Sequence, residues 1–134
     1  MIQSPDTRRL ILHNPLIHHL DTVAQERMLA SAQESSHDTG ALLIRQGQDA
    51  DRFFIVLKGR VKLFRISADG QEKVVEIIHP GQTFAEAVMF MQKSIFPVCA
   101  ETLEPVHLVS LPNRLMLQLL QENPQSCLHL LGHM

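Results

Sequence analysis

Short apolar segments that alternate with turn residues fill the middle of this chain and limit the folds that it can adopt. Predicted strands cover residues 42–44, 53–57, 60–66, 74–78, 98–103 and 106–111. Turn residues at intervals of about 8–12 positions predict a barrel, sandwich or jelly roll. Asp69-Gly70 is expected to form a two-residue type I′ hairpin turn, because both central positions of that turn need a positive φ.

Helical patterns flank these strands on both sides. Residues 7–33 are predicted to be helical, with a break at Asn14-Pro15 and Asp21 as the N-cap of the second part. The apolar residues at helical spacing are Leu16, Leu20, Val23, Met28 and Leu29. We therefore expect one mainly β domain over residues 1–134, with N-terminal helices (1–33), a β-roll (34–111) and C-terminal helices (112–134).

The C-terminal helices are expected to begin at two prolines. Pro112 opens the first, and Asn123-Pro124 provides an N-cap and a first-turn proline for the second. The second helix is strongly apolar, so we expect it to be the start of a longer helix whose apolar stripe needs a partner. The alternative is a natural end at Gly132, which could act as a C-cap.

Composition and motifs exclude several classes of protein. A net charge of −2 gives no basis for strong binding of nucleic acid or anionic membranes by this segment. Cys99 and Cys127 form no CxxC motif and are expected to be buried thiols of a cytoplasmic protein. No signal peptide, membrane-length apolar run, P-loop, HExxH or GxSxG motif is present, so an enzyme is not expected.

Residues 83–90 place a lone carboxylate, Glu86, inside an almost wholly apolar run. Together with residues 40–47 (Gly-Ala-Leu-Leu-Ile-Arg-Gln-Gly) and 53–60 (Phe-Phe-Ile-Val-Leu-Lys-Gly-Arg), this run resembles the cyclic-nucleotide-binding fold of the Crp/Fnr regulators. Residues 69–73 followed by 83–87 are similar to the Dnr-type regulators of denitrification. The resemblance implies an eight-stranded, double-stranded β-roll of the jelly-roll type.

The resemblance also identifies residues 81–90 with the phosphate-binding cassette of the family. In nucleotide-binding members a glycine precedes the glutamate, which binds the ribose 2′-OH, and an arginine ten positions later pairs with the phosphate. Here Ala85 replaces the glycine, and Phe96 followed by Pro97 replaces the arginine and a small hydroxyl residue. A buried phosphate without a charge partner costs several kcal/mol. We therefore expect that cAMP does not bind.

The remaining residues of this region are expected to line a ligand pocket that is largely apolar. They are Phe84, Ala85, Glu86, Ala87, Val88, Met89, Phe96, Pro97 and Val98, with Phe90, Met91 and Ile95 beside them. The alternative is that these side chains simply fill the core of the roll, with Glu86 as a structural carboxylate that caps the cassette helix.

The Dnr-like resemblance implies haem b as cofactor and nitric oxide as the ligand that is sensed. Haem iron needs an axial donor, most often histidine. The candidates are His13, His18, His19 and His129, with His79 and His107 as further ones, and the pair His18-His19 is preferred. No zinc-type spacing is present, and with no cysteine before Cys99 the iron–sulfur cluster of the Fnr branch is not expected.

The function expected from these observations is ligand sensing in a regulator of denitrification genes. The resemblance implies a homodimer through the C-terminal helix, and DNA binding through a helix-turn-helix domain that this chain lacks. Two alternatives remain: a β-roll that acts as a dimerisation scaffold without a cofactor, and a cyclic-nucleotide-binding regulatory domain. A cupin-type enzyme is a more distant alternative, since the clustered His and Glu ligands of such a site are absent.

Overall fold

The computed structural model describes residues 4–91 and 94–122. The predicted second C-terminal helix, with Asn123-Pro124, Cys127 and His129, lies outside these residues. The described elements are α1 (Pro5–His13), α2 (Pro15–His18), α3 (Thr22–Ser31), β1 (Gln33–His37), β2 (Leu42–Ile44), β3 (Arg52–Lys58), β4 (Val61–Ile66), β5 (Glu72–Ile78), β6 (Thr83–Phe84), η1 (Glu86–Phe90), β7 (Cys99–Thr102), β8 (Val106–Pro112) and α4 (Asn113–Glu122).

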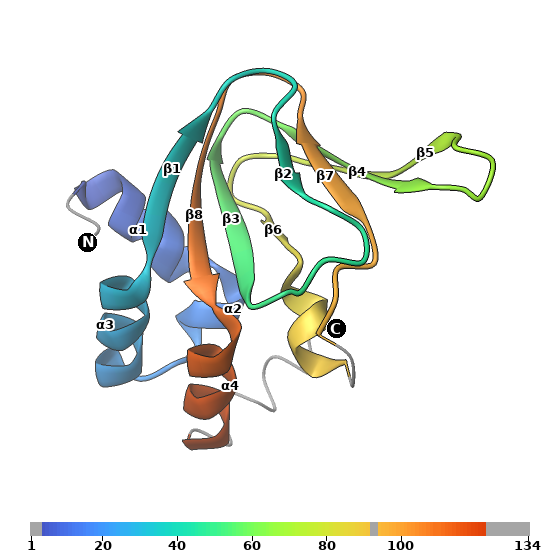
Figure 1. Ribbon diagram of the computed structural model, residues 1–134. Helices are drawn as coiled ribbons and strands as arrows, with labels where there is room; N and C mark the ends of the chain where they lie inside the picture. Colours follow the sequence, from blue (N-terminus) through green and yellow to red (C-terminus); the bar gives the residue numbers. More distant parts are fainter. Residues whose placement is uncertain (1–3, 92–93, 123–134) are drawn as a thin grey trace.

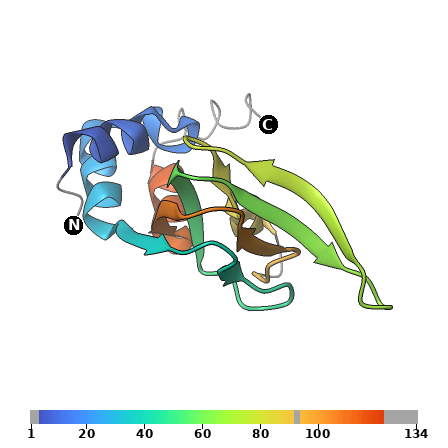
Figure 2. The same ribbon diagram turned by 90° about the horizontal axis from the view of Figure 1, so that it is seen from above.

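The strands form two antiparallel four-stranded sheets, in the orders β1-β8-β3-β6 and β2-β7-β4-β5. The helices gather beside the first sheet, and the β4–β5 ribbon projects away from the body of the domain (Figures 1 and 2). This arrangement confirms the predicted jelly roll with flanking helices. No helix within the described ranges is long and apolar enough to cross a membrane.

Side-chain caps explain where the N-terminal helices begin. Ser4 caps α1, Asn14 caps α2, and Asp21 Oδ1 accepts a hydrogen bond from the backbone N–H of Ala24 at 2.8 Å. The predicted break at Asn14-Pro15 and the predicted cap at Asp21 are confirmed. Val23 was expected on the apolar face of α3, but its side chain is 71% exposed, since α3 packs inward through Ala24, Met28 and Leu29 instead.

Two apolar clusters pack on opposite faces of β3 in the first sheet. Phe53 and Ile55 of β3 face the helices, while Val56, the next residue of the strand, faces the interior of the roll. Because successive side chains of a strand point to opposite faces, β3 is buried on both sides, which explains its unbroken apolar run. The cassette contributes to both clusters, with Val88 in the roll and Met89 among the helices.

The turn between β4 and β5 differs from the prediction. Gly70 has a φ of +82°, but Asp69 is not among the residues with positive φ. The backbone N–H of Gly70 donates to the carbonyl of Ser67 at 2.9 Å, and the N–H of Ser67 donates to the carbonyl of Gln71. A type I turn closed by a left-handed glycine forms the hairpin, so the predicted type I′ turn is wrong.

Candidate functional site

Within the cassette, a single unusual residue connects β6 to the short helix η1. Ala85 has φ +67° and ψ +8°, and among the described residues it is the one non-glycine residue with a positive φ. Glycine is the residue that ordinarily occupies this left-handed conformation, because it has no Cβ. Ala85 therefore has a backbone conformation that suits glycine, the residue that the family resemblance places at this position.

Backbone hydrogen bonds hold the start of the cassette against β3. The N–H of Gly81 donates to the carbonyl of Val56 at 2.7 Å, and the N–H of Val56 donates to the carbonyl of Gln82 at 3.0 Å. The rings of Phe54 and Phe84 then stack with their centroids 4.9 Å apart. The position of Glu86 is thus determined by the sheet on one side.

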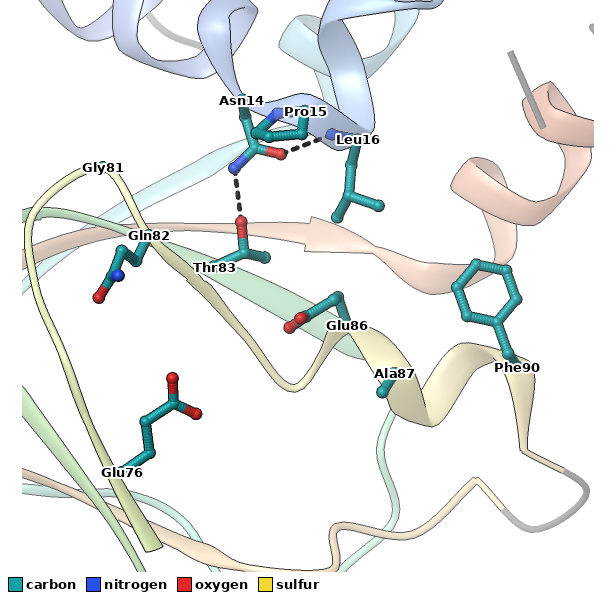
Figure 3. A pocket seen from close by; sticks show the side chains of 10 residues that line it. All are labelled: Asn14, Pro15, Leu16, Glu76, Gly81, Gln82, Thr83, Glu86, Ala87 and Phe90. Atoms are coloured by element: carbon teal, nitrogen blue, oxygen red, sulfur yellow. Dashed lines mark hydrogen bonds between the residues drawn. The ribbon is translucent and has the colours of Figure 1, made fainter. Parts of the chain in front are cut away.

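Asn14 connects the cassette to the N-terminal helices on the other side. Its side chain is only 2% exposed. Its Oδ1 accepts a hydrogen bond from the N–H of Leu16 at 3.0 Å, and its Nδ2 donates to Oγ1 of Thr83 (Figure 3). Both ends of this buried amide are therefore satisfied, and α2 is joined directly to β6.

A pocket of about 440 Å³ lies between this junction and the cassette, and we call it the helix–cassette pocket. Figure 3 shows Glu86 and Glu76 on opposite sides of it. A volume in this range is large enough for a small-molecule ligand. The residues that line it are Asn14, Pro15, Leu16, Glu76, Gly81, Gln82, Thr83, Glu86, Ala87 and Phe90.

The charge of the helix–cassette pocket is negative. Partial burial raises the pKa of the Glu86 carboxyl, and the nearby Glu76 carboxylate raises it further, against a hydrogen bond from the N–H of Glu86 itself that lowers it. No Lys, Arg or His is among the described residues that line the pocket. Among these described residues an anionic ligand would meet two carboxylates and no cation.

Eight of the nine predicted pocket residues line a second, smaller pocket of about 190 Å³ inside the roll, here called the roll pocket. Phe84, Val88 and Phe96 are buried there, Ala85, Glu86 and Val98 are half-buried, and Ala87 and Pro97 are exposed. Met89 is the ninth, and it packs with the helices. Met91 also lines the roll pocket and Phe90 the helix–cassette pocket, whereas Ile95 forms a bridge with Asp49.

Phe96 is part of the apolar core at the position that corresponds to the family's phosphate-binding arginine. Its side chain is 5% exposed and packs in the roll cluster. Its N–H donates to the carbonyl of Gln48 at 2.9 Å, and its carbonyl accepts from the N–H of Gly47 at 2.8 Å. The aromatic ring is therefore held inward, and none of the described residues that line the roll pocket is a cation.

The candidate haem ligands that the structure describes lie away from both of these pockets. No described residue that lines the helix–cassette or roll pocket is a histidine. His13 and His18 lie beside a separate surface pocket of about 450 Å³, with their rings nearly parallel and 6.3 Å apart between centroids. The ring of His19 meets that of His18 edge-on at 5.3 Å. His79 is exposed, and Nε2 of His107 pairs with Glu34 at 2.7 Å.

The surface pocket has a donor set that suits a haem. Imidazoles can bind iron, Arg9 can pair with a propionate carboxylate, and Leu12 offers apolar contact, whereas the guanidinium of Arg8 is already paired with Glu26. Among the described residues, the groups that could hold a haem therefore lie on the N-terminal helices. Within the described ranges, no group of three or more His, Cys, Asp or Glu side chains is arranged to hold a metal ion.

Several lining residues of the helix–cassette pocket were not predicted. Asn14 was interpreted only as a helix break, and nothing in the sequence indicates that its amide is buried. Glu76 lies on the exposed face of β5, where a carboxylate is ordinary in a strand. The signal that could have found Asn14 is its position as an N-cap before proline, which fixes the direction of its side chain.

Comparisons with known proteins agree with this geometry. A model of the cyclic nucleotide-binding domain family matches residues 34–123. The sensor domain of the transcriptional regulator DNR from Pseudomonas aeruginosa superposes with a TM-score of 0.89 at 34% identity, covering 95% of this chain and 85% of that one. A structure of DNR from the same organism gives a TM-score of 0.90 at 33% identity, covering 98% and 58%.

Curated relatives point to the same family. The cAMP-activated global transcriptional regulator CRP of Pasteurella multocida is 24% identical over 105 residues, which is 78% of this chain and 50% of that protein. The cyclic AMP receptor protein of Thermus thermophilus is 30% identical over 73 residues, covering 54% and 34%. The chain spans half or less of the length of these two relatives. It belongs to the cyclic nucleotide-binding domain family and corresponds to the sensor domain of CRP-family transcription regulators.

Proposed function

We propose that this chain senses a ligand other than a cyclic nucleotide for a transcription regulator. The observation that carries the proposal is the charge of the cassette region. The described residues around its two pockets include Glu76 and Glu86 but no cation, and Phe96 is buried where the family's arginine would be. A phosphate placed there would lose its hydration without gaining a charge partner, which costs several kcal/mol.

Calorimetry with cAMP tests this proposal. The 134-residue chain should give no measurable heat of binding and no shift in Tm. The double variant Ala85→Gly/Phe96→Arg restores the glycine and the guanidinium, and it should bind cAMP more tightly than the wild type if it folds. Micromolar affinity of the wild-type chain would overturn the proposal.

The effector that we propose is haem b, with nitric oxide as the gas that is sensed. The support is the resemblance to Dnr-type regulators together with the His13–His18 pair on the N-terminal helices. His13 and His18 would hold the iron, with His19 beside them, and Arg9 would pair with a propionate, since Arg8 is already paired with Glu26. Haem, when bound, would supply an iron centre able to take up nitric oxide. His129 stays a candidate ligand outside the described residues.

Titration with hemin tests the proposal that this chain binds haem. A sharp Soret band at one-to-one stoichiometry is expected, and it should weaken in His13→Ala and His18→Ala variants. His37→Ala is the matched control, because His37 lies at the end of β1 and is not among the candidate ligands. An unchanged spectrum in a His13→Ala/His18→Ala variant would contradict the assigned ligands. No Soret band at all would favour the alternative of a dimerisation scaffold without a cofactor.

We further propose that the parent protein binds DNA through a domain outside this chain, dimerises through its C-terminal helix and controls denitrification genes in the cytoplasm. The support is that CRP-family relatives are transcription regulators of at least twice the matched length. Catalysis is not part of the proposed role. Sedimentation of the 134-residue chain, with and without hemin, tests whether this chain forms a dimer by itself.

A further inference from the structure

A serine, a histidine and a glutamate form a hydrogen-bonded chain across strands β1 and β8, and none of them lines the pockets described above. In the register of the two strands Ser36 lies directly opposite His107, and Glu34 precedes Ser36 by two positions on the same face of β1. Oγ of Ser36 lies 2.9 Å from Nδ1 of His107, and Nε2 of His107 lies 2.7 Å from Oε2 of Glu34. We call these three residues the β1–β8 triad.

The carboxylate of Glu34 determines which nitrogen of His107 carries the proton. An ionised carboxylate only accepts hydrogen bonds, so Nε2 must donate to it. In the neutral imidazole the other nitrogen, Nδ1, is then an acceptor, and Ser36 must donate its hydroxyl proton to it. A base that is oriented by a third group and accepts the hydroxyl proton is the arrangement that activates a serine nucleophile.

The neighbouring serine provides a comparison for the β1–β8 triad. Ser35 lies on the other face of β1, and its Oγ lies 2.9 Å from Nε2 of His37. Among the described residues, no carboxylate pairs with the imidazole of His37. The two serines therefore have histidine partners at the same distance, and they differ in whether that histidine is bound to a carboxylate.

The β1–β8 triad is accessible to solvent. β1 is an edge strand of the first sheet, and β8 is its strand partner (Figure 1). Ser36 is exposed, while the side chains of Glu34 and His107 are 30% and 32% exposed. The hydroxyl that would react therefore faces solvent, and the two groups that support it are partly shielded from water.

We propose that Ser36 is a site of covalent acylation, at which the protein accepts an acyl group from an activated ester. Oγ of Ser36 attacks the carbonyl carbon while its proton passes to Nδ1 of His107. The bond from that carbon to the leaving oxygen then breaks, the leaving group departs as its anion, and His107 gives its extra proton to solvent. Glu34 orients the imidazole and stabilises its charged form during the transfer. The product is one serine ester per chain.

Incubation of the 134-residue chain with p-nitrophenyl acetate tests the proposal. Release of p-nitrophenolate follows the reaction, and fragmentation mass spectrometry locates the acetyl group. Acetylation of Ser36 should exceed that of Ser35 by about tenfold or more, because the carboxylate supports the base of Ser36. Ser36→Ala should remove this label. Equal labelling of the two serines, or none at Ser36, would overturn the proposal, and this comparison needs no variant.

Histidine variants distinguish the β1–β8 triad from ordinary reactivity of a surface serine. His107→Gln removes the base and should slow the acetylation of Ser36 by about 100-fold. His37→Ala is the matched control, because it removes the partner of Ser35 and should leave the rate at Ser36 unchanged. Thermal unfolding of both variants establishes that the rates refer to folded protein. An unchanged rate in folded His107→Gln would contradict the assignment.

Glu34 is a positioning residue, and the protonation of the imidazole tests its role. Nitrogen NMR above neutral pH, where imidazole is neutral, should find the proton of His107 on Nε2 in the wild-type chain. Glu34→Ala should remove this preference and slow the acetylation. Glu34→Gln, whose Oε1 can still accept from Nε2, should restore part of both. A tautomer that responds to neither variant would contradict the role of Glu34.

Discussion

Two buried asparagines stand at the beginning of helices, one on each side of the cassette, and they differ in how their hydrogen bonds are used. Asn14 has both ends of its amide paired, one with the backbone of α2 and the other with Thr83. Asn113 donates one long hydrogen bond through Nδ2, and its Oδ1 has no hydrogen-bond partner. Their exposures, 2% and 6%, are almost the same.

The difference shows that burial of a polar side chain does not by itself indicate a binding site. Asn14 is explained fully by structure, because it caps a helix and joins it to β6. Asn113 has a hydrogen-bonding capacity that the described fold leaves unused. The same substitution made at each of the two residues tests whether they differ in this way.

Asn14→Leu is expected to have the largest effect. It removes the cap of α2, leaves the N–H of Leu16 without a partner and breaks the link to Thr83. A lost N-cap costs about 1 kcal/mol and a lost hydrogen bond about the same, so the free energy of unfolding should fall by about 2 kcal/mol. Urea denaturation measures this, and a change below 0.5 kcal/mol, roughly the error of such data, would contradict it.

Thr83→Val should have an intermediate effect, because it removes only the acceptor of the Asn14 amide. A loss of about 1 kcal/mol is expected. In a double-mutant cycle with Asn14→Leu the two losses should not add, since they break the same bond. Additive losses would show that the two side chains act separately.

Asn113→Leu is the matched counterpart of the first substitution and should have a smaller effect. It removes an unpaired acceptor together with the long Nδ2 hydrogen bond to the Ala50 carbonyl, so the free energy of unfolding should stay within about 1 kcal/mol of the wild type. The same urea titration compares the two. A loss equal to that of Asn14→Leu would mean that Asn113 is structural, and the contrast would disappear.

Glu86→Gln should have the smallest effect, and one that depends on pH. Because burial raises the pKa of the Glu86 carboxyl in the folded state, its ionised form is disfavoured there, and the penalty is complete above that pKa. Glutamine should therefore stabilise the domain slightly at neutral pH. The advantage should shrink as pH falls through the raised pKa and vanish below the ordinary pKa of glutamate. An advantage that grows in acid would contradict the assigned direction.

Much of the fold was predictable because its apolar pattern is strong. The run at 53–57 predicted a buried strand, and β3 is buried on both faces. β1 (Gln33–His37) was not predicted, since Gln-Glu-Ser-Ser-His has no apolar alternation and its place in the sheet comes from backbone pairing with β8. Turn geometry also escaped prediction at Asp69, because Asp-Gly suits more than one type of hairpin.

The candidate sites were less predictable than the fold. The cassette could be located because Glu86 interrupts an apolar run, and the roles of its neighbours as pocket residues stay predictions. The surroundings of Asn113 gave no signal, since its hydrogen-bond partners Ala50 and Asp51 are far from it in the sequence. An unpaired oxygen is a property of three-dimensional surroundings, and no residue pattern encodes it.

The left-handed Ala85 has a consequence for the populations of cassette conformations. An L-residue in this region costs roughly 1–2 kcal/mol compared with glycine. Since about 1.4 kcal/mol corresponds to a factor of ten in an equilibrium constant, an arrangement in which Ala85 returns to an ordinary φ gains about tenfold in relative population over the same domain with glycine. Relative to glycine, the alanine thus favours any cassette arrangement in which this position has an ordinary φ.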